Sequence, residues 1–213
     1  MNSKSDCAAT GGTRHVVLVH GIFNTGWVFR TMVRAFEQKG FYCHVIRLTP
    51  SWGGAPIESL SAQLSQFIKN RVSDEEKVSL VGFSMGSLVC RYYLEYLDGI
   101  QKVTGFYSIS GPHHGTVWSW FWVGKGTAQM RINSPFLRHL KVGEAVLRES
   151  GIPVVSYRTP YDQVIIPSTS SHWDLAENIV YPLISHQWMP HSKRVIEDIS
   201  RRLATQSPDS DQI

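Results

Sequence analysis

The sequence predicts an α/β fold in which a mostly parallel sheet of about six strands is covered by helices on both faces. Two observations lead to this prediction. Short apolar, β-branched runs alternate along the chain with segments whose apolar residues recur at helical spacing. The 213 residues, 42% hydrophobic and 18% charged, also have the length and composition of one globular domain.

The first half of the chain contains three of the expected strands. We place strands at 15–21 (HVVLVHG), 42–48 (YCHVIRL) and 77–83 (KVSLVGF), because each is a short, nearly continuous apolar run. Helices are expected near 26–39, ending at Gly40, then at 57–71 after the Pro- and Gly-rich turn 49–56, and at 85–97.

The second half continues the pattern with one interruption. Strands are expected at 103–110 and 152–157, a weaker sixth at 178–184, and a last helix at 192–203. Between the fourth and fifth strands, residues 111–148 form an insertion that begins with a segment rich in Gly and Trp and continues as a helix. Insertions at the carboxyl end of a parallel sheet are where loops contact ligands, so we expect this one over the active site.

The chain ends predict the domain limits and the compartment. Residues 1–14 and 204–213 are small, polar and aperiodic, so we expect a flexible leader, one α/β domain over 15–203 and a flexible tail. The leader lacks the apolar core of a secretion signal, and no apolar run approaches the roughly 18 residues of a membrane span. A cytoplasmic protein is therefore predicted, with leaderless or processed export as the alternative.

Cysteine usage and charge limit the partners. Three cysteines, Cys7, Cys43 and Cys90, cannot all pair within one chain, and the last two lie in apolar segments, which favours buried thiols in a reducing compartment. The net charge of +4 is spread along the sequence, so no nucleic-acid surface is expected. The oligomeric state is not predicted.

Ser84 is the strongest candidate for a catalytic residue. It lies at the centre of VSLVGFSMGSLV (78–89), where a predicted strand meets a predicted helix and Gly82 and Gly86 stand two residues to either side. This G-x-S-x-G context is typical of a sharp turn that holds a nucleophilic serine in a strained, exposed conformation. Amino-terminal N–H groups of the following helix, beginning with Met85, would face the developing oxyanion.

A nucleophilic serine requires a base and an acid that orients it. Asp162 follows the fifth strand in TPYDQVIIP, where its position favours the acid, and Asp174 is the alternative. Two histidines compete for the base: His186 follows the apolar run before the last helix, and His191 precedes Ser192 at the start of that helix. Spacing alone does not decide between them.

Four motifs give the chain a specific resemblance: LVHGIFNTGWVF, LVGFSMGSLVCRYYL, SISGPHHGT and HQWMPHSKRVIEDI. Over almost all of 15–202 the sequence resembles small bacterial lipases and esterases of the α/β-hydrolase fold. In such proteins the triad occurs in the order Ser, Asp or Glu, His. Their pattern around the last histidine implies His186 as the base, with His191 at a position where the family often has tyrosine, so that His191 stays the alternative.

The resemblance also implies the rest of the site. The His-Gly-x motif of these lipases corresponds to HGIF and puts the second oxyanion donor at the N–H of Ile22, with Phe23 as a second choice. The GPHHGT segment would be a structural loop, so His113 and His114 are expected to be satisfied loop residues rather than ligands. Neither a metal nor a cofactor is expected.

The predicted function is that of a serine carboxylic ester hydrolase of the carboxylesterase or triacylglycerol lipase type, acting on apolar acyl esters through an acyl-enzyme. Trp118, Trp120, Phe121 and Trp122 in the insertion are expected to form an acyl-chain wall or a patch for transient contact with a lipid interface, with Trp27 and Phe29 lining the same groove. Alternatives are an acyltransferase or a thioesterase with the same triad, or a non-catalytic module that binds a lipid or a partner.

Overall fold

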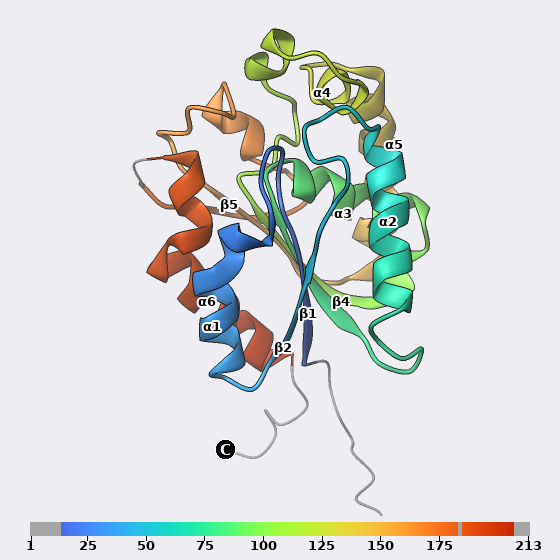
Figure 1. The fold of residues 1–213 in the computed structure, drawn as a ribbon, viewed down its shortest axis with the longest axis vertical. Helices are drawn as coiled ribbons and strands as arrows, with labels where there is room; N and C mark the ends of the chain where they lie inside the picture. Colours follow the sequence, from blue (N-terminus) through green and yellow to red (C-terminus); the bar gives the residue numbers. More distant parts are fainter. Residues whose placement is uncertain (1–13, 183–184, 207–213) are drawn as a thin grey trace, which may run out of the picture.

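The computed structural model describes residues 14–182 and 185–206. Within them lies one parallel sheet with the strand order β2-β1-β3-β4-β5-β6 (Figure 1). The strands are β1 (His15–Val19), β2 (Tyr42–Ile46), β3 (Val78–Phe83), β4 (Val103–Ile109), β5 (Val154–Arg158) and β6 (Glu177–Val180). The predicted parallel sheet of about six strands is therefore confirmed.

Helices connect the strands and cover both faces of the sheet. The α-helices are α1 (Arg30–Glu37), α2 (Ile57–Lys69), α3 (Met85–Tyr96), α4 (Lys125–Gln129), α5 (Pro135–Ser150) and α6 (Lys193–Thr205). Shorter 3₁₀ helices are η1 (Gly26–Phe29), η2 (Gly99–Gln101), η3 (Val117–Phe121), η4 (Ser168–Ser171) and η5 (His186–His191). Figure 1 shows α1 and α6 on one face and α2, α3 and α5 on the other.

The central strands are buried on both faces, as their apolar sequences require. All six residues of β3 are buried, and successive residues point to opposite layers. Val17 and Leu80 belong to the core beneath α2, α3 and α5. Leu18 and Val81 belong to the core beneath α1 and α6. A continuous apolar run therefore contributes to two cores at once.

Two helices differ from the sequence prediction. The helix expected at 26–39 is a 3₁₀ turn, η1, followed by the shorter α1. Here the chain passes close to β2, because a Cβ added to Gly26 would lie 2.6 Å from Val45 Cγ1. The last helix continues to Thr205. The side chain of Gln206 just beyond it bonds to the Tyr107 hydroxyl (3.0 Å) and to Ser79 (3.2 Å), which anchors this end to the sheet.

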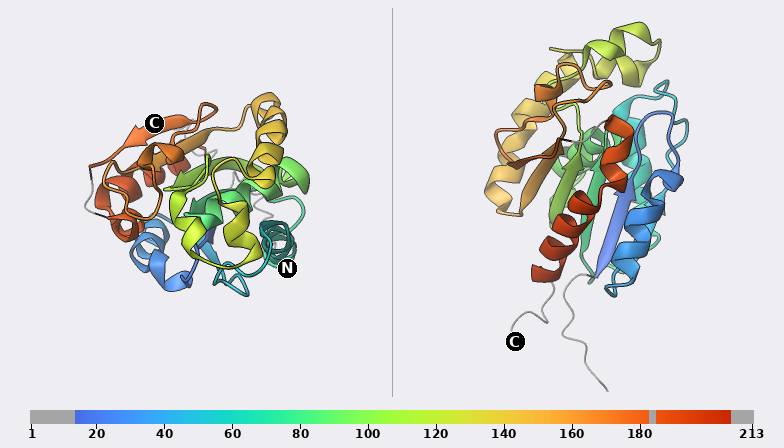
Figure 2. Two further views of the ribbon diagram at one scale, coloured as in Figure 1. Left: turned by 90° about the horizontal axis from the view of Figure 1, so that it is seen from above. Right: turned by 90° about the vertical axis from the view of Figure 1, so that its left-hand side faces the viewer.

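The carboxyl ends of the strands lie at one end of the molecule, and η3 and α4 lie over that end (Figures 1 and 2). In the part of the chain that the structure describes, no helix is both long enough and apolar enough to cross a bilayer. Cys90 is fully buried and Cys43 is half-buried, and both are free thiols. Cys7, with most of the predicted leader and tail, lies outside the described residues.

Candidate active site

Ser84 occupies a strained turn between β3 and α3. Its φ of 54° and ψ of −124° are values that residues with a side chain rarely adopt, and its N–H donates to the carbonyl of Ile109 (2.9 Å). A Cβ added to Gly82 would lie 2.7 Å from Ser87 Cα, and one added to Gly86 would lie 2.1 Å from the carbonyl oxygen of Val19. Only glycine fits at these two positions, which explains the G-x-S-x-G spacing.

The loop after β1 faces this turn. In the sheet Val19 pairs with Gly82, so the residues that follow each strand emerge side by side. A Cβ added to Gly21 would lie 2.8 Å from Ser84 Cβ and 3.4 Å from Ser84 Oγ. The peptide between Gly21 and Ile22 is therefore adjacent to the serine side chain, at the position that the His-Gly-x motif implies.

The ring of His20 holds that peptide in one orientation. Leu48 donates its N–H to His20 Nε2 (3.1 Å), so the proton of the neutral ring is on Nδ1, which donates to the carbonyl of Gly21 (2.9 Å). His20 is fully buried, and burial lowers the pKa of its ring. Because C=O and N–H point in opposite directions in a trans peptide, a Gly21 carbonyl bonded to His20 directs the N–H of Ile22 away from the ring.

Two N–H groups next to Ser84 are available to a substrate oxygen. Met85 is the first residue of α3, where a helix has no internal acceptor for the N–H. Among the described residues, no acceptor is found for the N–H of Ile22 or of Met85. The second choice, Phe23, is unsuitable, because its N–H is already bonded to the carbonyl of Ser51 (2.8 Å). The geometry therefore favours Ile22 and Met85 as the pair of oxyanion donors.

Asp162 and His186 form a buried hydrogen-bonded pair. His186 Nδ1 lies 2.8 Å from Asp162 Oδ2, while the other carboxylate oxygen accepts the N–H groups of Val164 (2.9 Å) and Ile165 (2.7 Å). Burial alone would raise the pKa of Asp162, but its bonds to His186 and to the two backbone groups lower that pKa overall. The carboxylate thus stays ionised and fixes the orientation of the imidazole.

His186 is the first residue of η5, and its ring lies beside the serine turn. The ring centroids of His186 and Phe83, the residue before Ser84, are 4.8 Å apart. Ser185 caps η5 by accepting the N–H of Gln187 (3.2 Å), which fixes the start of the turn on which the histidine stands. Ser84, His186 and Asp162 therefore come from three separate segments to the same edge of the sheet.

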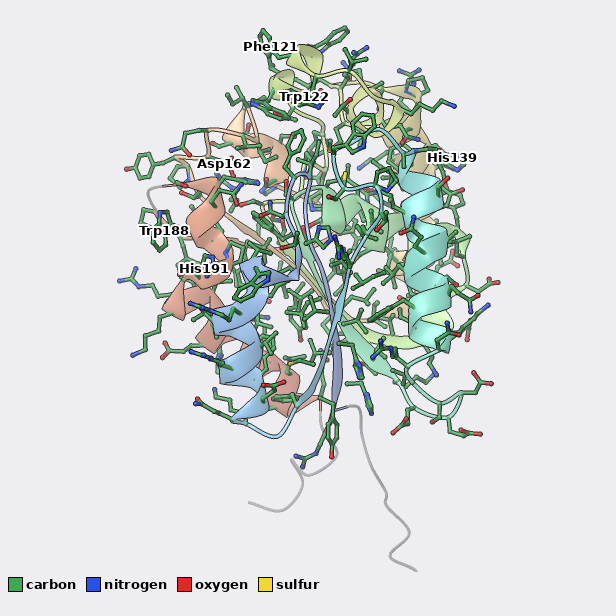
Figure 3. All side chains as sticks on the ribbon, in the orientation of Figure 1. Phe121, Trp122, His139, Asp162, Trp188 and His191 are labelled. Carbon is green, nitrogen blue, oxygen red and sulfur yellow. The ribbon has the colours of Figure 1, made fainter. Side chains whose placement is uncertain are left out.

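The alternative residues lie elsewhere. His191 is at the other end of η5, with Nδ1 3.4 Å from the Thr31 hydroxyl of α1. Figure 3 shows His191 on the side of α1, away from Asp162. Asp174 is exposed and pairs with His172 (3.5 Å). His191 therefore contacts Thr31 instead of a carboxylate, and Asp174 contacts His172 instead of His186.

The expectation for His113 is partly wrong. His113 is buried, with Nε2 2.8 Å from the Ser108 hydroxyl and its ring stacked on Trp173 (4.5 Å), but Nδ1 has no partner among the described residues. Burial lowers the pKa of this ring well below its usual value, so it stays neutral. His114 is exposed, as a loop residue would be. No group of three metal-ligating side chains is found in the described part of the chain.

Aromatic side chains of the insertion reach the oxyanion loop. Phe23 packs edge-to-face against Trp122 (4.8 Å) and Trp118 (6.5 Å), whose rings are stacked 6.0 Å apart. The prediction for Phe29 is wrong, because it is fully buried in the core beneath α1 and α6. Trp27 lines a different groove of about 710 Å³ along η1, α1 and the end of β2, which includes no residue of the insertion.

One family model matches the part of the chain that contains Ser84 and the oxyanion loop. Residues 15–141, which include Ser84 and the oxyanion loop, match the family model described as palmitoyl protein thioesterase. The chain belongs to this family. Its curated relatives include the lysosomal thioesterase PPT2 of Mus musculus, 30% identical over 112 residues, and that of Rattus norvegicus, 30% identical over 109 residues. These matches cover 51% and 49% of this chain, but only 37% and 36% of the two relatives.

Solved structures confirm the α/β-hydrolase fold. The mature lipase BlEst2 of Bacillus licheniformis superposes with a TM-score of 0.71 at 13% identity, covering 88% of this chain and 91% of the lipase. Lipase B of Aspergillus fumigatus superposes with a TM-score of 0.77 at 18% identity, covering 92% of this chain and 54% of that one. The sequence resemblance to α/β-hydrolase lipases is thus confirmed for the fold.

Sequence reasoning missed the part that His20 plays. The motif predicts only that His20 begins the His-Gly-x turn, whereas its ring joins the ends of β1 and β2 to the oxyanion loop. The one sequence signal was its position directly after a buried strand. A second missed feature is fully buried Arg91, which bonds to Glu95 (2.8 Å) and Glu144 (3.2 Å) and thereby ties α3, the helix behind Ser84, to α5.

Proposed function

We propose that the protein is a serine hydrolase that cleaves thioesters, and also oxygen esters, of apolar acyl groups through an acyl-enzyme. The observation that carries this proposal is the strained turn at Ser84, with φ 54°, beside a buried His186–Asp162 pair joined at 2.8 Å. A nucleophile on a sharp strand-to-helix turn and a histidine oriented by a carboxylate are the two parts that acyl transfer requires.

In the proposed mechanism His186 Nε2 takes the proton of Ser84 as its Oγ forms a bond to the carbonyl carbon. The N–H groups of Ile22 and Met85 stabilise the oxyanion. When the tetrahedral intermediate collapses, the carbon–sulfur or carbon–oxygen bond breaks, and the leaving group receives the proton from His186. Water then gives a proton to His186 and attacks the acyl-enzyme. When this second tetrahedral intermediate collapses, the bond between the acyl carbon and Ser84 Oγ breaks, Oγ takes the proton back from His186, and the acid is released. Asp162 stays ionised throughout, as its lowered pKa favours.

The family supports a thioester as the preferred bond, since its description names a palmitoyl protein thioesterase. An apolar acyl group is supported by the aromatic cluster of Phe23, Trp118 and Trp122, which lies against the oxyanion loop. Substrates with such acyl groups gather at lipid surfaces, so transient contact with a lipid interface is part of the proposal. An acyltransferase would use the same residues with an alcohol or amine in place of water.

The test compares a thioester and an oxygen ester that carry the same acyl group, from acetyl to palmitoyl. We expect the thioester to be cleaved faster, with an optimum at longer chains. Ser84→Ala is expected to lower kcat by roughly 10⁴-fold or more. The matched control, Ser59→Ala, changes an exposed serine of α2 and should leave kcat unchanged.

Folded protein that cleaves neither substrate would overturn the proposed hydrolase. So would a Ser84→Ala variant that keeps its activity. Faster product formation from an added alcohol than from water, measured as new ester against free acid, would instead identify an acyltransferase.

A further inference from the structure

The insertion contains a small apolar projection, which we call the aromatic tip and define as residues 120–123 (Trp120, Phe121, Trp122 and Val123). Phe121 is 79% exposed and Val123 is 89% exposed, the two highest fractions among the large apolar side chains of the described residues. Figure 3 shows Phe121 and Trp122 at the extreme end of the molecule, beyond Asp162. The proposed function does not use the two most exposed of these residues.

The aromatic tip is held firmly at its base. Trp118 is half-buried against the core and stacks on Trp122, and Thr127 donates to the Trp122 carbonyl (3.3 Å). The N–H of Lys125 is bonded to the carbonyl of Gly54 (3.3 Å). The exposed apolar side chains therefore stand on a backbone that hydrogen bonds and packing hold in place.

The charges beside the aromatic tip are mainly positive, and one carboxylate from another element reaches α4, where Glu58 of α2 accepts a hydrogen bond from Gln129 Nε2 (2.6 Å). Between Asp98 and Glu144 the sequence contains no Asp or Glu, whereas Lys125 and Arg131 flank the tip. The guanidinium of Arg131 lies over the ring of Trp120, 4.4 Å from its centroid, so the positive charge is next to the apolar side chains. A surface that presents aromatic rings next to the cations Lys125 and Arg131 is complementary to an apolar layer bordered by anions.

We propose that the aromatic tip docks the protein on the surface of an anionic lipid bilayer. Trp and Phe side chains enter the headgroup region, while Lys125 and Arg131 pair with lipid anions. Stable protein–protein interfaces bury about 800 Å² on each partner, which is large compared with one short turn, so we favour a bilayer over a protein partner. The role of docking in bringing the active site to its substrate rests on the proposed function. Binding to the bilayer does not require the enzyme to turn over.

Docking would bring the lipid surface to the oxyanion loop. Phe23, which follows Ile22, has its ring 4.8 Å from the ring of Trp122, so the base of the aromatic tip and this loop form one aromatic cluster. An acyl chain that leaves the bilayer next to the tip would thus meet apolar side chains on its way to Ser84.

The test measures co-sedimentation of the full-length Ser84→Ala protein with vesicles of phosphatidylcholine, with and without phosphatidylserine. We expect binding to the mixed vesicles only, weakened by salt. Phe121→Ser combined with Val123→Ser should lower the partition coefficient about tenfold or more. The matched control is Tyr42→Ser combined with Val142→Ser, which changes two exposed apolar residues elsewhere and should alter binding less than twofold. Lys125→Gln should reduce binding about fivefold, and the control Lys39→Gln should not.

Equal binding to neutral and anionic vesicles, equal effects of the tip and control variants, or no binding at all would each overturn the proposal. So would concentration-dependent dimerisation that the tip variant abolishes, since the aromatic tip would then contact a second copy. Hydrolysis of a soluble short-chain thioester by the wild-type protein is measured separately. Vesicle binding without hydrolysis would reject the proposed function and support the docking surface. Hydrolysis without vesicle binding would support the proposed function and reject the docking surface.

Discussion

Replacing His20 by Phe tests whether the orientation of one peptide determines catalysis. Phe keeps the volume and the aromatic ring of His20 but removes both ring nitrogens, so the N–H of Leu48 loses its acceptor and the carbonyl of Gly21 loses its shorter bond. The remaining bond to that carbonyl, from the N–H of Asn24, is long at 3.3 Å. The peptide before Ile22 then becomes free to rotate, and its N–H no longer points to the oxyanion.

The magnitude follows from these two hydrogen bonds. An unsatisfied buried donor costs about 1–3 kcal/mol of stability, so the free energy of unfolding should fall by this amount. The lost bond to Gly21 stabilises the catalytic orientation by about 1 kcal/mol, and complete loss of an oxyanion donor costs about 10²- to 10³-fold in kcat. We therefore expect kcat to fall about 10- to 100-fold while KM changes less than threefold.

The assay is steady-state hydrolysis of a short-chain thioester, with urea unfolding measured on the same samples. The control is His44→Phe, which changes a half-buried histidine of β2 whose ring stacks on His15, a contact that involves neither Ser84 nor the oxyanion loop. A folded His20→Phe variant with kcat within threefold of the wild type would refute the reasoning. An equal loss in His44→Phe would show that the effect is not specific to the oxyanion loop.

Three further outcomes are expected. Asp162→Asn should lower kcat roughly 10⁴-fold without changing the melting temperature much, whereas Asp174→Asn should keep full activity, and the opposite result would reassign the acid. Gly86→Ala should destabilise the fold by more than about 4 kcal/mol, because its Cβ would lie 2.1 Å from the Val19 carbonyl; a melting temperature within a few degrees of the wild type would contradict this. Stability should fall as the pH drops below about 6.5, because burial lowers the pKa values of His20 and His113 in the folded state, so the unfolded chain takes up these protons first. Thermal unfolding between pH 8 and pH 5 measures this, and a melting temperature that rises with acid would contradict it.

Much of the fold could be predicted because its signals are local. Strands β1, β3 and β4 are buried on both faces, so their sequences are almost continuously apolar, and the intervening helices carry apolar residues at helical spacing. The first helix was predicted too long: its first turn is the 3₁₀ helix η1, which begins at Gly26, where the chain passes close to Val45 of β2. That contact joins residues that are distant in the sequence, and no local pattern reports it.

The serine turn could likewise be read from the sequence. Gly82, Ser84 and Gly86 belong to one turn, and the steric reason for both glycines concerns residues within five positions or the neighbouring strand β1. A strand, a tight turn and a helix in direct succession leave few alternatives for the residue between them. The sequence by itself therefore determined the α/β fold and the candidate nucleophile.

Only the tertiary structure decided which residues face the nucleophile. His186 and His191 lie five positions apart in the same short segment, and one 3₁₀ turn directs the first toward Asp162 and the second toward Thr31 of α1. The ring of His20 meets Leu48 because β1 and β2 are neighbours in the sheet. Such contacts depend on strand order and on the path of loops between elements, which are long-range properties of packing, whereas periodicity and glycine sterics act along a few residues of chain.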